Sequence, residues 1–552
     1  MKLKLLWLAA CASLLAGCAT IPHTGNAGVG PDVTSGLNND EVYYSQSGPY
    51  AGATPDAILY GFLSAGNGPQ NDYAVAREYL TKDFATKWQP NASVLIQEGP
   101  PQVIPLTDHS YRVVVTISAE IDSDGRYATL PVGTKRSFDV EMVKAAGEWR
   151  IADAPDQTIV VRSNFKVIFR AYSLYFFDPS LTFLVPDVRW FPSRASTGTR
   201  LMNALLKGPS DWLRPAVVSV IPIGTKLNIN SVTVEEGVAQ VDLSAAALKV
   251  SNARRSLMKA SISATLSQLN EVSSVEISIQ RTPQTIGNYS SGQPPSLGSY
   301  PVVLTQNGLF FLNASGAQIV PGTESKVLSL KPTDFAFSKS DSRIAFVTPS
   351  GVHLTSADPL NDSDRVVDAR PNQLSPQFDS RGQLWTLARS PNAAFVVTGI
   401  DRKTLGNPWL NGIPVSFSVS PEGARLAVVY QVADKRILSV YPIERNKKGE
   451  VVSVGAPVIV PKTPPQIFTV TWSDSVTLAA LTKRADAGFV PMFFTIGGEQ
   501  TSASALNEAT SLSVSGRGQL FVLQPSGNVV DAKGSTWETI AQAVIALHIS
   551  TE

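Results

Sequence analysis

The stretch Phe417-Ser418-Val419-Ser420-Pro421-Glu422-Gly423 decides the fold of the C-terminal half, because it is one of five similar turns that each precede an apolar strand. The other four turns end at Ser342, Gly382, Ser475 and Gly518, so the successive intervals are 40, 41, 52 and 43 residues. One blade of a β-propeller takes about 40–50 residues. We therefore expect residues 301–552 to form an all-β propeller of about six blades.

The long interval of 52 residues contains the charged run Glu444–Gly449. We predict that this run is a loop insertion in one blade. A propeller closes when its first and last blades meet, so truncation at either end is expected to destabilise the ring.

Residues 171–285 predict an α/β domain. A helix carries Leu201 and Leu205 on one face and stops at Gly208-Pro209, since glycine ends helices and proline cannot continue them. A hairpin turns at Glu236-Gly237, and a long helix then leads to a strand at Val275–Ile279. Three separated motifs, Leu206–Pro209, Ile221–Thr225 and Val241–Ser244, resemble the GerMN domain of spore-germination and cell-envelope proteins.

Residues 46–170 predict an α+β domain. Thr54-Pro55 supplies an N-cap and a proline for a first helix, and a second helix is expected after Asp72. The pattern then alternates as in strands, over Tyr111–Ile121, Tyr127–Pro131, Ser137–Val143 and Trp149–Ala152, with a hairpin turn at Asp124-Gly125. The segment Gly147–Asp153 resembles the last strand of NTF2-like domains. Residues 286–300, rich in Pro, Gly and Ser, predict a linker between the second domain and the propeller.

The first residues predict a lipoprotein signal peptide over 1–17. Lys2 and Lys4 precede an apolar run of twelve residues, shorter than the roughly 20 that span a bilayer as a helix. Leu15-Ala16-Gly17-Cys18 resembles the lipobox of bacterial lipoproteins, which implies a lipid on Cys18. Residues 18–45 are then a lipidated tether on the extracytoplasmic face of the cell membrane.

Composition and motifs argue against nucleic-acid binding and catalysis. Without residues 1–17 the chain has 44 basic and 45 acidic side chains, whereas a phosphate-binding protein has a basic excess. No nucleophile elbow, lactamase motif or Walker loop occurs. None of the four histidines has metal-ligand spacing, so each is expected in a turn or on the surface. We predict no enzyme, no cofactor and no metal.

Several polar and aromatic residues have two interpretations. Asp341, Asp379 and Asp474 occupy equivalent turns, where such side chains cap backbone amides more often than they act as acids or bases. Trp190, Trp212 and Trp385 could face a ligand, but core or domain-interface positions are favoured. The run Arg189, Trp190, Phe191 is interpreted as an exposed partner-binding cluster.

The order of lipobox, NTF2-like segment, GerMN motifs and propeller resembles the LpqB family of actinobacterial lipoproteins over essentially the whole chain. The resemblance implies an accessory protein of the MtrA/MtrB two-component system. Its expected partner is the extracytoplasmic domain of the sensor histidine kinase MtrB, in cell-envelope homeostasis and division. The alternative is a peptidoglycan- or glycan-binding envelope protein without kinase contact. An enzyme of the propeller hydrolase type is the third hypothesis.

Overall fold

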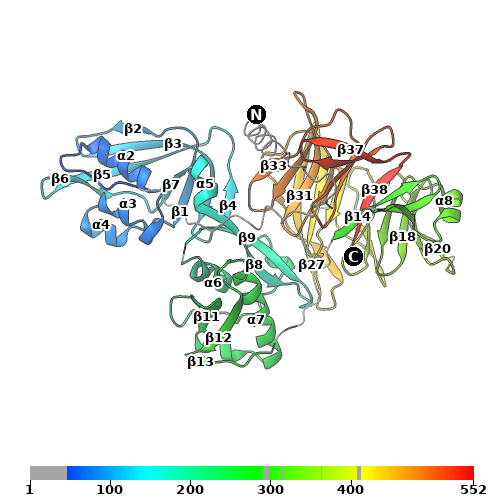
Figure 1. Ribbon diagram of the computed structural model, residues 1–552, viewed down its shortest axis with the longest axis horizontal. Coiled ribbons are helices and arrows are strands. Elements are labelled where there is room, and N and C mark those ends of the chain that lie inside the picture. The colour runs from blue at the N-terminus through cyan, green and yellow to red at the C-terminus, as the bar shows by residue number, and fades with distance from the viewer. Residues whose placement is uncertain are drawn as a thin grey trace, which may run out of the picture. The chain divides into compact units, whose positions relative to one another are not determined.

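The computed structural model describes residues 46–194, 196–287, 289, 297–313, 315–361, 363–406 and 412–551 (Figure 1). These residues belong to one compact unit, 42–552. The predicted signal peptide 1–17, the lipid site Cys18 and the tether 18–45 lie outside the described residues, as does most of the predicted linker 286–300.

The first part of the unit is a curved sheet covered by helices. The helices are α2 Pro55–Ala65, α3 Ala74–Glu78, α4 Lys82–Lys87 and α5 Arg162–Ile168. The strands are β1 Ser93–Gln97, β2 Gln102–Pro105, β3 Ser110–Asp122, β4 Tyr127–Thr129, β5 Lys135–Ala145, β6 Glu148–Asp153 and β7 Thr158–Val161. Their order is β6-β5-β3-β1-β7, with β2 and β4 also paired to β3. An α+β arrangement follows.

The first predicted helix is confirmed, and the second is shorter than expected. The Thr54 hydroxyl caps α2 by accepting a hydrogen bond from the Ala57 amide, and the buried face of α2 packs on the sheet. Tyr73 is in the left-handed region (φ 60°), and α3 ends after five residues. Thr81 then caps a separate helix, α4, by accepting from the Phe84 amide. The sequence patterns missed β1, β2, β7 and α5.

The second part contains a long hairpin and an α/β layer. Its elements are β8 Phe169–Phe177, β9 Leu184–Pro192, α6 Thr197–Lys207, β10 Thr233–Glu235, β11 Val238–Leu243, α7 Asn252–Leu266, β12 Ser274–Ile279 and β13 Thr282–Pro283. Strands β11 and β12 are parallel, with α7 connecting them, in a sheet of order β10-β11-β12-β13. Leu201 and Leu205 of α6 share one core with Met258 and Ile262 of α7. The predicted α/β fold is confirmed here.

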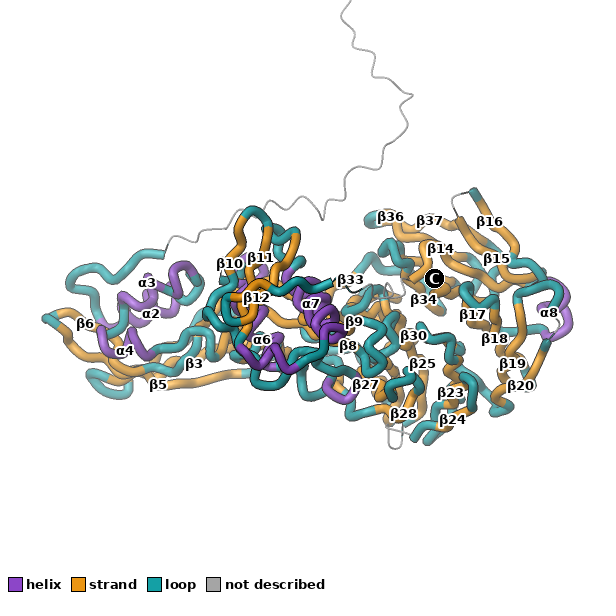
Figure 2. Tube along the Cα trace, turned by 90° about the horizontal axis from the view of Figure 1, so that it is seen from below, coloured by secondary structure: helices purple, strands orange, loops and turns teal. Residues whose placement is uncertain are grey.

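The regular elements of the C-terminal part are strands with one short helix, joined by loops, which confirms the expected all-β class of this region (Figure 2). One sheet has the order β16-β15-β14-β38-β17-β18-β19-β20. Four more sheets follow along the chain, β21 to β24, β25 to β29, β30 to β33 and β34 to β37. The last strand, β38, pairs antiparallel with β14 (Figure 1). The two ends of this region therefore share one sheet.

The strands of the C-terminal part have the following bounds: β14 Leu297–Thr305, β15 Gly308–Asn313, β16 Gly316–Ile319, β17 Asp334–Ser338, β18 Arg343–Thr348, β19 Gly351–Ser356, β20 Asp364–Asp368, β21 Gln377–Phe378, β22 Leu384–Thr386, β23 Val396–Thr398, β24 Arg402–Thr404, β25 Ile413–Val419, β26 Arg425–Val432, β27 Lys435–Arg445, β28 Val451–Val454, β29 Val458–Ile459, β30 Ile467–Trp472, β31 Thr477–Arg484, β32 Gly488–Thr495, β33 Gln500–Ser502, β34 Ser511–Val514, β35 Leu520–Leu523, β36 Val529–Lys533, β37 Thr536–Ala541 and β38 Ala546–Thr551. One helix, α8 Glu324–Leu330, lies among them.

The prediction of a loop insertion at Glu444–Gly449 is wrong in its first two residues. Glu444 and Arg445 belong to the end of β27, which pairs with β28. Arg445 is buried and forms an ion pair with Asp379 at 2.7 Å. The charged run therefore contains one arginine whose charge is paired in the interior of the protein. A local sequence pattern does not distinguish such an arginine from one exposed to solvent.

Candidate functional site

The interpretation of Arg189, Trp190 and Phe191 as an exposed cluster is wrong. All three lie on β9, and they are 1%, 9% and 5% exposed. Strand β9 is buried almost along its whole length, because parts distant in the sequence pack against it, whereas alternate residues of β8 stay partly exposed. Because these side chains are buried, there is no longer a reason to assign this run to partner binding. Strand β9 instead lies where the three parts of the unit meet.

Trp190 lies at the centre of that junction. Its indole Nε1 donates a hydrogen bond to the Gly497 carbonyl at 2.8 Å. Its ring centroid lies 4.9 Å from that of Phe165 and 5.5 Å from that of Tyr127, and Val476 packs on the same cluster. The cluster therefore contains residues of all three parts of the unit, and the domain-interface interpretation of Trp190 is confirmed.

Ion pairs tie the same parts together. Lys166 of α5 pairs with Glu499 at 2.7 Å, and Arg162 approaches the same carboxylate at 3.5 Å. Arg381 of the C-terminal part donates to Asp178 at 2.6 Å, and the Asp178 carboxylate is 2% exposed. Of these pairs, the one between Arg381 and Asp178 is largely buried, and removing one of its partners leaves a costly buried charge.

A buried polar network begins on β9 beside Trp190. The Asp187 carboxylate accepts hydrogen bonds from the Ser210 amide at 2.7 Å and from Arg189 Nη2 at 2.9 Å. Arg189 Nη1 donates to the Ser210 hydroxyl at 2.7 Å, whereas Arg189 Nε has no hydrogen-bond partner. Burial lowers the pKa of Arg189, and the Asp187 charge opposes that shift. Asp187 and Arg189 are two residues apart on β9 and therefore share a face, which is the one sign in the sequence that points to Asp187.

A cavity of about 330 Å³ opens next to this network. Its wall combines residues of all three parts of the unit, among them Arg126, Arg189, Trp212, Arg425, Val458 and Gly497. Tyr127 also lines it, and burial together with the nearby Glu499 charge raises the pKa of Tyr127 to about 12. The phenol is therefore neutral near pH 7, and it can donate a hydrogen bond.

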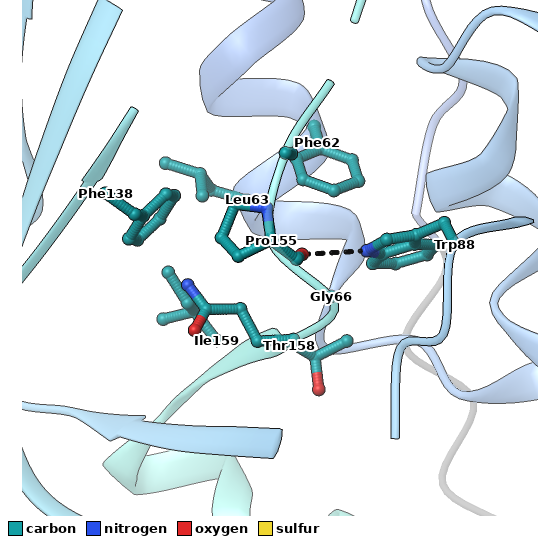
Figure 3. Close-up of a pocket in the computed structure, with 10 residues that line it drawn as sticks. Phe62, Leu63, Gly66, Trp88, Phe138, Pro155, Thr158 and Ile159 are labelled. Atoms are coloured by element: carbon teal, nitrogen blue, oxygen red, sulfur yellow. Dashed lines mark hydrogen bonds between the residues drawn. The ribbon is translucent and has the colours of Figure 1, made fainter. Parts of the chain in front are cut away.

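A second, much smaller pocket lies in the N-terminal part (Figure 3). Phe62, Leu63, Trp88 and Phe138 line it, and Trp88 Nε1 donates to the Pro155 carbonyl at 3.2 Å. Its volume of about 10 Å³ is at the lower limit for one water molecule. The aromatic side chains around this pocket belong to the hydrophobic core of the N-terminal part.

The turn carboxylates are held in structural hydrogen bonds. Asp379 caps the amides of Arg381 and Gln383, both at 2.9 Å, as predicted. Asp474 accepts from the amides of Val476 and Thr477 in the same way. Asp341 differs, because its carboxylate pairs with the Arg343 side chain. The favoured core interpretation holds for Trp385, which is fully buried and donates to Asp379 at 3.0 Å, while Trp212 is partly buried.

Two of the three described histidines depart from the turn or surface positions predicted for them, and His23 lies outside the described residues. His109 is exposed in a turn, as predicted. His353 is only 8% exposed and lies between Ser350 and Asp364, and His548 of β38 pairs with Asp334 at 2.6 Å. Among the described residues, no three His, Cys, Asp or Glu side chains gather as a metal site. Within the described ranges, no helix combines the length and apolarity needed to cross a bilayer.

Three family models match the chain in order. Residues 48–166 match the N-terminal domain of lipoprotein LpqB, residues 173–285 match a sporulation and spore germination family, and residues 306–546 match the LpqB β-propeller domain.

Relatives agree with these matches. Lipoprotein LpqB of Cutibacterium acnes is 24% identical over 98% of each chain. Lipoprotein LpqB of Nocardia farcinica is 34% identical over 36% of this chain and 32% of its own. A solved structure of the tandem GerMN domains of GerM from Bacillus subtilis matches 26% of this chain and 58% of its own, at 16% identity and a TM-score of 0.18. The chain belongs to the LpqB family of lipoproteins, with a GerMN-type domain between the family's N-terminal domain and its propeller.

Proposed function

We propose that this protein is a membrane-anchored accessory lipoprotein that binds and modulates an MtrB-like sensor histidine kinase. A lipid on Cys18 holds it at the extracytoplasmic face of the cell membrane, and the tether 18–45 carries the compact unit. The expected partner is the extracytoplasmic domain of the kinase, in envelope homeostasis and division.

The observation that carries this proposal is the junction around Trp190. Three modules that could move independently are joined by one aromatic cluster and several ion pairs. A rigid unit can favour one conformation of a bound partner, because its contact residues lose little further freedom on binding. The turn carboxylates Asp379 and Asp474 are occupied with backbone amides, which favours a binding role over acid–base chemistry.

The energy needed for such modulation is small. A preference of about 1–3 kcal/mol for one kinase conformation shifts its equilibrium about 5–150-fold. Anchoring both proteins in one membrane raises their effective concentration. A contact of modest affinity is therefore sufficient.

Finer features of the fold belong to the same proposal. We infer an NTF2-like N-terminal domain and a six-bladed propeller, whose first blade is completed by β38 beside β14. The sheet order supports the propeller. Strands β16, β15, β14 and β38 lie side by side in this order, so β38 would be the innermost of the four strands of the first blade.

The experiment is a deletion strain complemented with variants. Response-regulator phosphorylation under wall stress is expected to change on deletion and to return with the wild-type chain. Cys18→Ser, which removes the lipid attachment atom, is expected not to restore it, whereas Ser35→Ala in the same segment restores it. Unchanged phosphorylation after deletion contradicts the proposal. In that case, retention of the protein on purified cell wall would identify it as a glycan-binding protein.

A further inference from the structure

The cavity beside the Asp187 network has a mostly apolar wall. Val188 of β9 and Trp212, which follows α6, contribute side chains to it from the second part, and Val440, Val458 and Ile496 contribute from the C-terminal part. Its volume of about 330 Å³ lies within the range of small-molecule sites, which are about 300–1,000 Å³ and are frequent at domain interfaces. The space therefore suits a small ligand with an apolar body.

The polar side of the cavity is rich in donors. Arg126, Arg189 and Arg425 line it, and Asp187 is its single carboxylate. Both oxygens of Asp187 already accept hydrogen bonds from Ser210 and Arg189. Arg189, with 2% of its side chain exposed, has an Nε without a partner, and Arg126 Nε is likewise buried and without a partner.

Unpartnered buried donors of this kind are costly, and a guanidinium is a strong donor to carboxylate and phosphate. A bound anion would accept from these Nε groups, and the gain comes from satisfying the two donors, because each of the three guanidinium charges already has an acidic partner. Arg126 and Arg425 keep their own acidic partners, Asp124 at 3.3 Å and Glu422 at 2.8 Å, so the network stays intact around a bound molecule.

We infer that this junction cavity binds an anionic amphiphile, a molecule with one carboxylate or phosphate head group and a short apolar chain. The head group contacts the Nε atoms of Arg189 and Arg126, and the chain lies against Val458 and Trp212. This site is separate from the proposed kinase contact, because its ligand is a small molecule enclosed between parts of this one chain.

The test is calorimetric titration of residues 42–552 with octanoate and with octyl phosphate, using octanol as the neutral probe of the same length. We expect saturable binding of at least one anion, and binding of octanol at least tenfold weaker. The tighter of the two anions identifies the head group. Octanol binding as tightly as both anions, or the absence of saturable binding, overturns the inference.

Two pairs of variants locate the site. Val458→Trp fills the cavity and should abolish binding, whereas Val452→Trp, on the neighbouring strand β28 and 46% exposed, should leave it unchanged. Arg126→Lys keeps the charge but removes the Nε donor, and it should weaken anion binding about tenfold without changing octanol binding. Arg136→Lys, outside the cavity wall, is the matched control. Binding that survives Val458→Trp in a folded protein contradicts the assignment.

Discussion

The indole Nε1 of Trp190 donates a hydrogen bond to the carbonyl of Gly497 at 2.8 Å, across 307 residues of sequence. Trp190 belongs to the hairpin of the second part, and Gly497 belongs to the turn between β32 and β33. The same indole packs on Phe165 of α5. One side chain thus connects the three parts that carry the proposed function.

Trp190→Phe is expected to lower the free energy of unfolding by about 0.5–1.5 kcal/mol, because the hydrogen bond from the buried indole to the Gly497 carbonyl is lost. Chemical denaturation followed by circular dichroism measures the change. Trp537→Phe is the matched control, since Trp537 is half-buried and its Nε1 has no hydrogen-bond partner. Equal losses for the two variants would contradict a specific role for the hydrogen bond.

The ion pair of Asp379 and Arg445 is the second test. Both side chains are at most 2% exposed, and Asp379 also accepts from Trp385 Nε1. Asp379→Ala leaves a buried guanidinium unpaired and should cost about 3–5 kcal/mol of unfolding free energy. Asp341→Ala removes a pair that is 32–43% exposed and should cost less than about 1 kcal/mol. Thermal unfolding measures the loss of unfolding free energy in both variants. A loss for Asp379→Ala as small as that for Asp341→Ala would contradict a stabilising role of the buried ion pair.

Acid stability should depend on Asp334 and His548, which join β17 to the last strand. Burial raises the pKa of Asp334, but the His548 charge and hydrogen bonds from His548, Ser375 and the Phe335 amide outweigh it, so the net pKa is lowered. The folded protein therefore binds this proton more weakly than the unfolded chain does. The stabilisation is complete above about pH 4 and is lost as the pH falls through the lowered pKa.

Asp334→Asn should consequently be less stable than the wild type near pH 7, with a difference that narrows below about pH 4. Unfolding midpoints measured from pH 7 to pH 3 test this expectation. Asp211→Asn provides the control, because the Asp211 carboxylate pairs with Arg214 on the surface and is 83% exposed. A pH-independent difference for Asp334→Asn would show that the carboxylate charge is not what stabilises the closure.

Closure of the C-terminal part predicts a further contrast. Leu547 of β38 is 1% exposed and lies opposite Val303 of β14, so Leu547→Ala should cost about 2–5 kcal/mol. Leu360→Ala, at a position 96% exposed, should change stability by less than about 0.5 kcal/mol. Differential scanning calorimetry compares them. Equal melting temperatures for the two variants would contradict the role of β38 in closing the C-terminal part.

The sequence predicted what depends on local spacing. The turn at Asp379 and the helix that begins at Pro55 follow from residue types that act on their own neighbours. The α/β order of the second part follows from periodicity, since α6 and α7 each have one apolar face.

The predictions that the structure contradicts concern residues whose surroundings come from contacts between distant segments. Arg189 looks exposed because arginine usually is, and only the fold brings Ser210 and Asp187 around it. The charged run around Arg445 predicts a loop, because charged residues are usually exposed. Its partner Asp379 lies 66 residues earlier and does not appear in the local pattern. The junction cavity draws on β4, β9 and β29, and a pattern along one chain does not reveal such an assembly.

The most direct test of the central claim is a titration of residues 42–552 with the isolated extracytoplasmic domain of the MtrB-like kinase from the same organism, at physiological salt. We expect a saturable complex with a dissociation constant in the micromolar range or tighter. With both proteins shown to be folded, the absence of any complex would contradict direct modulation of the kinase.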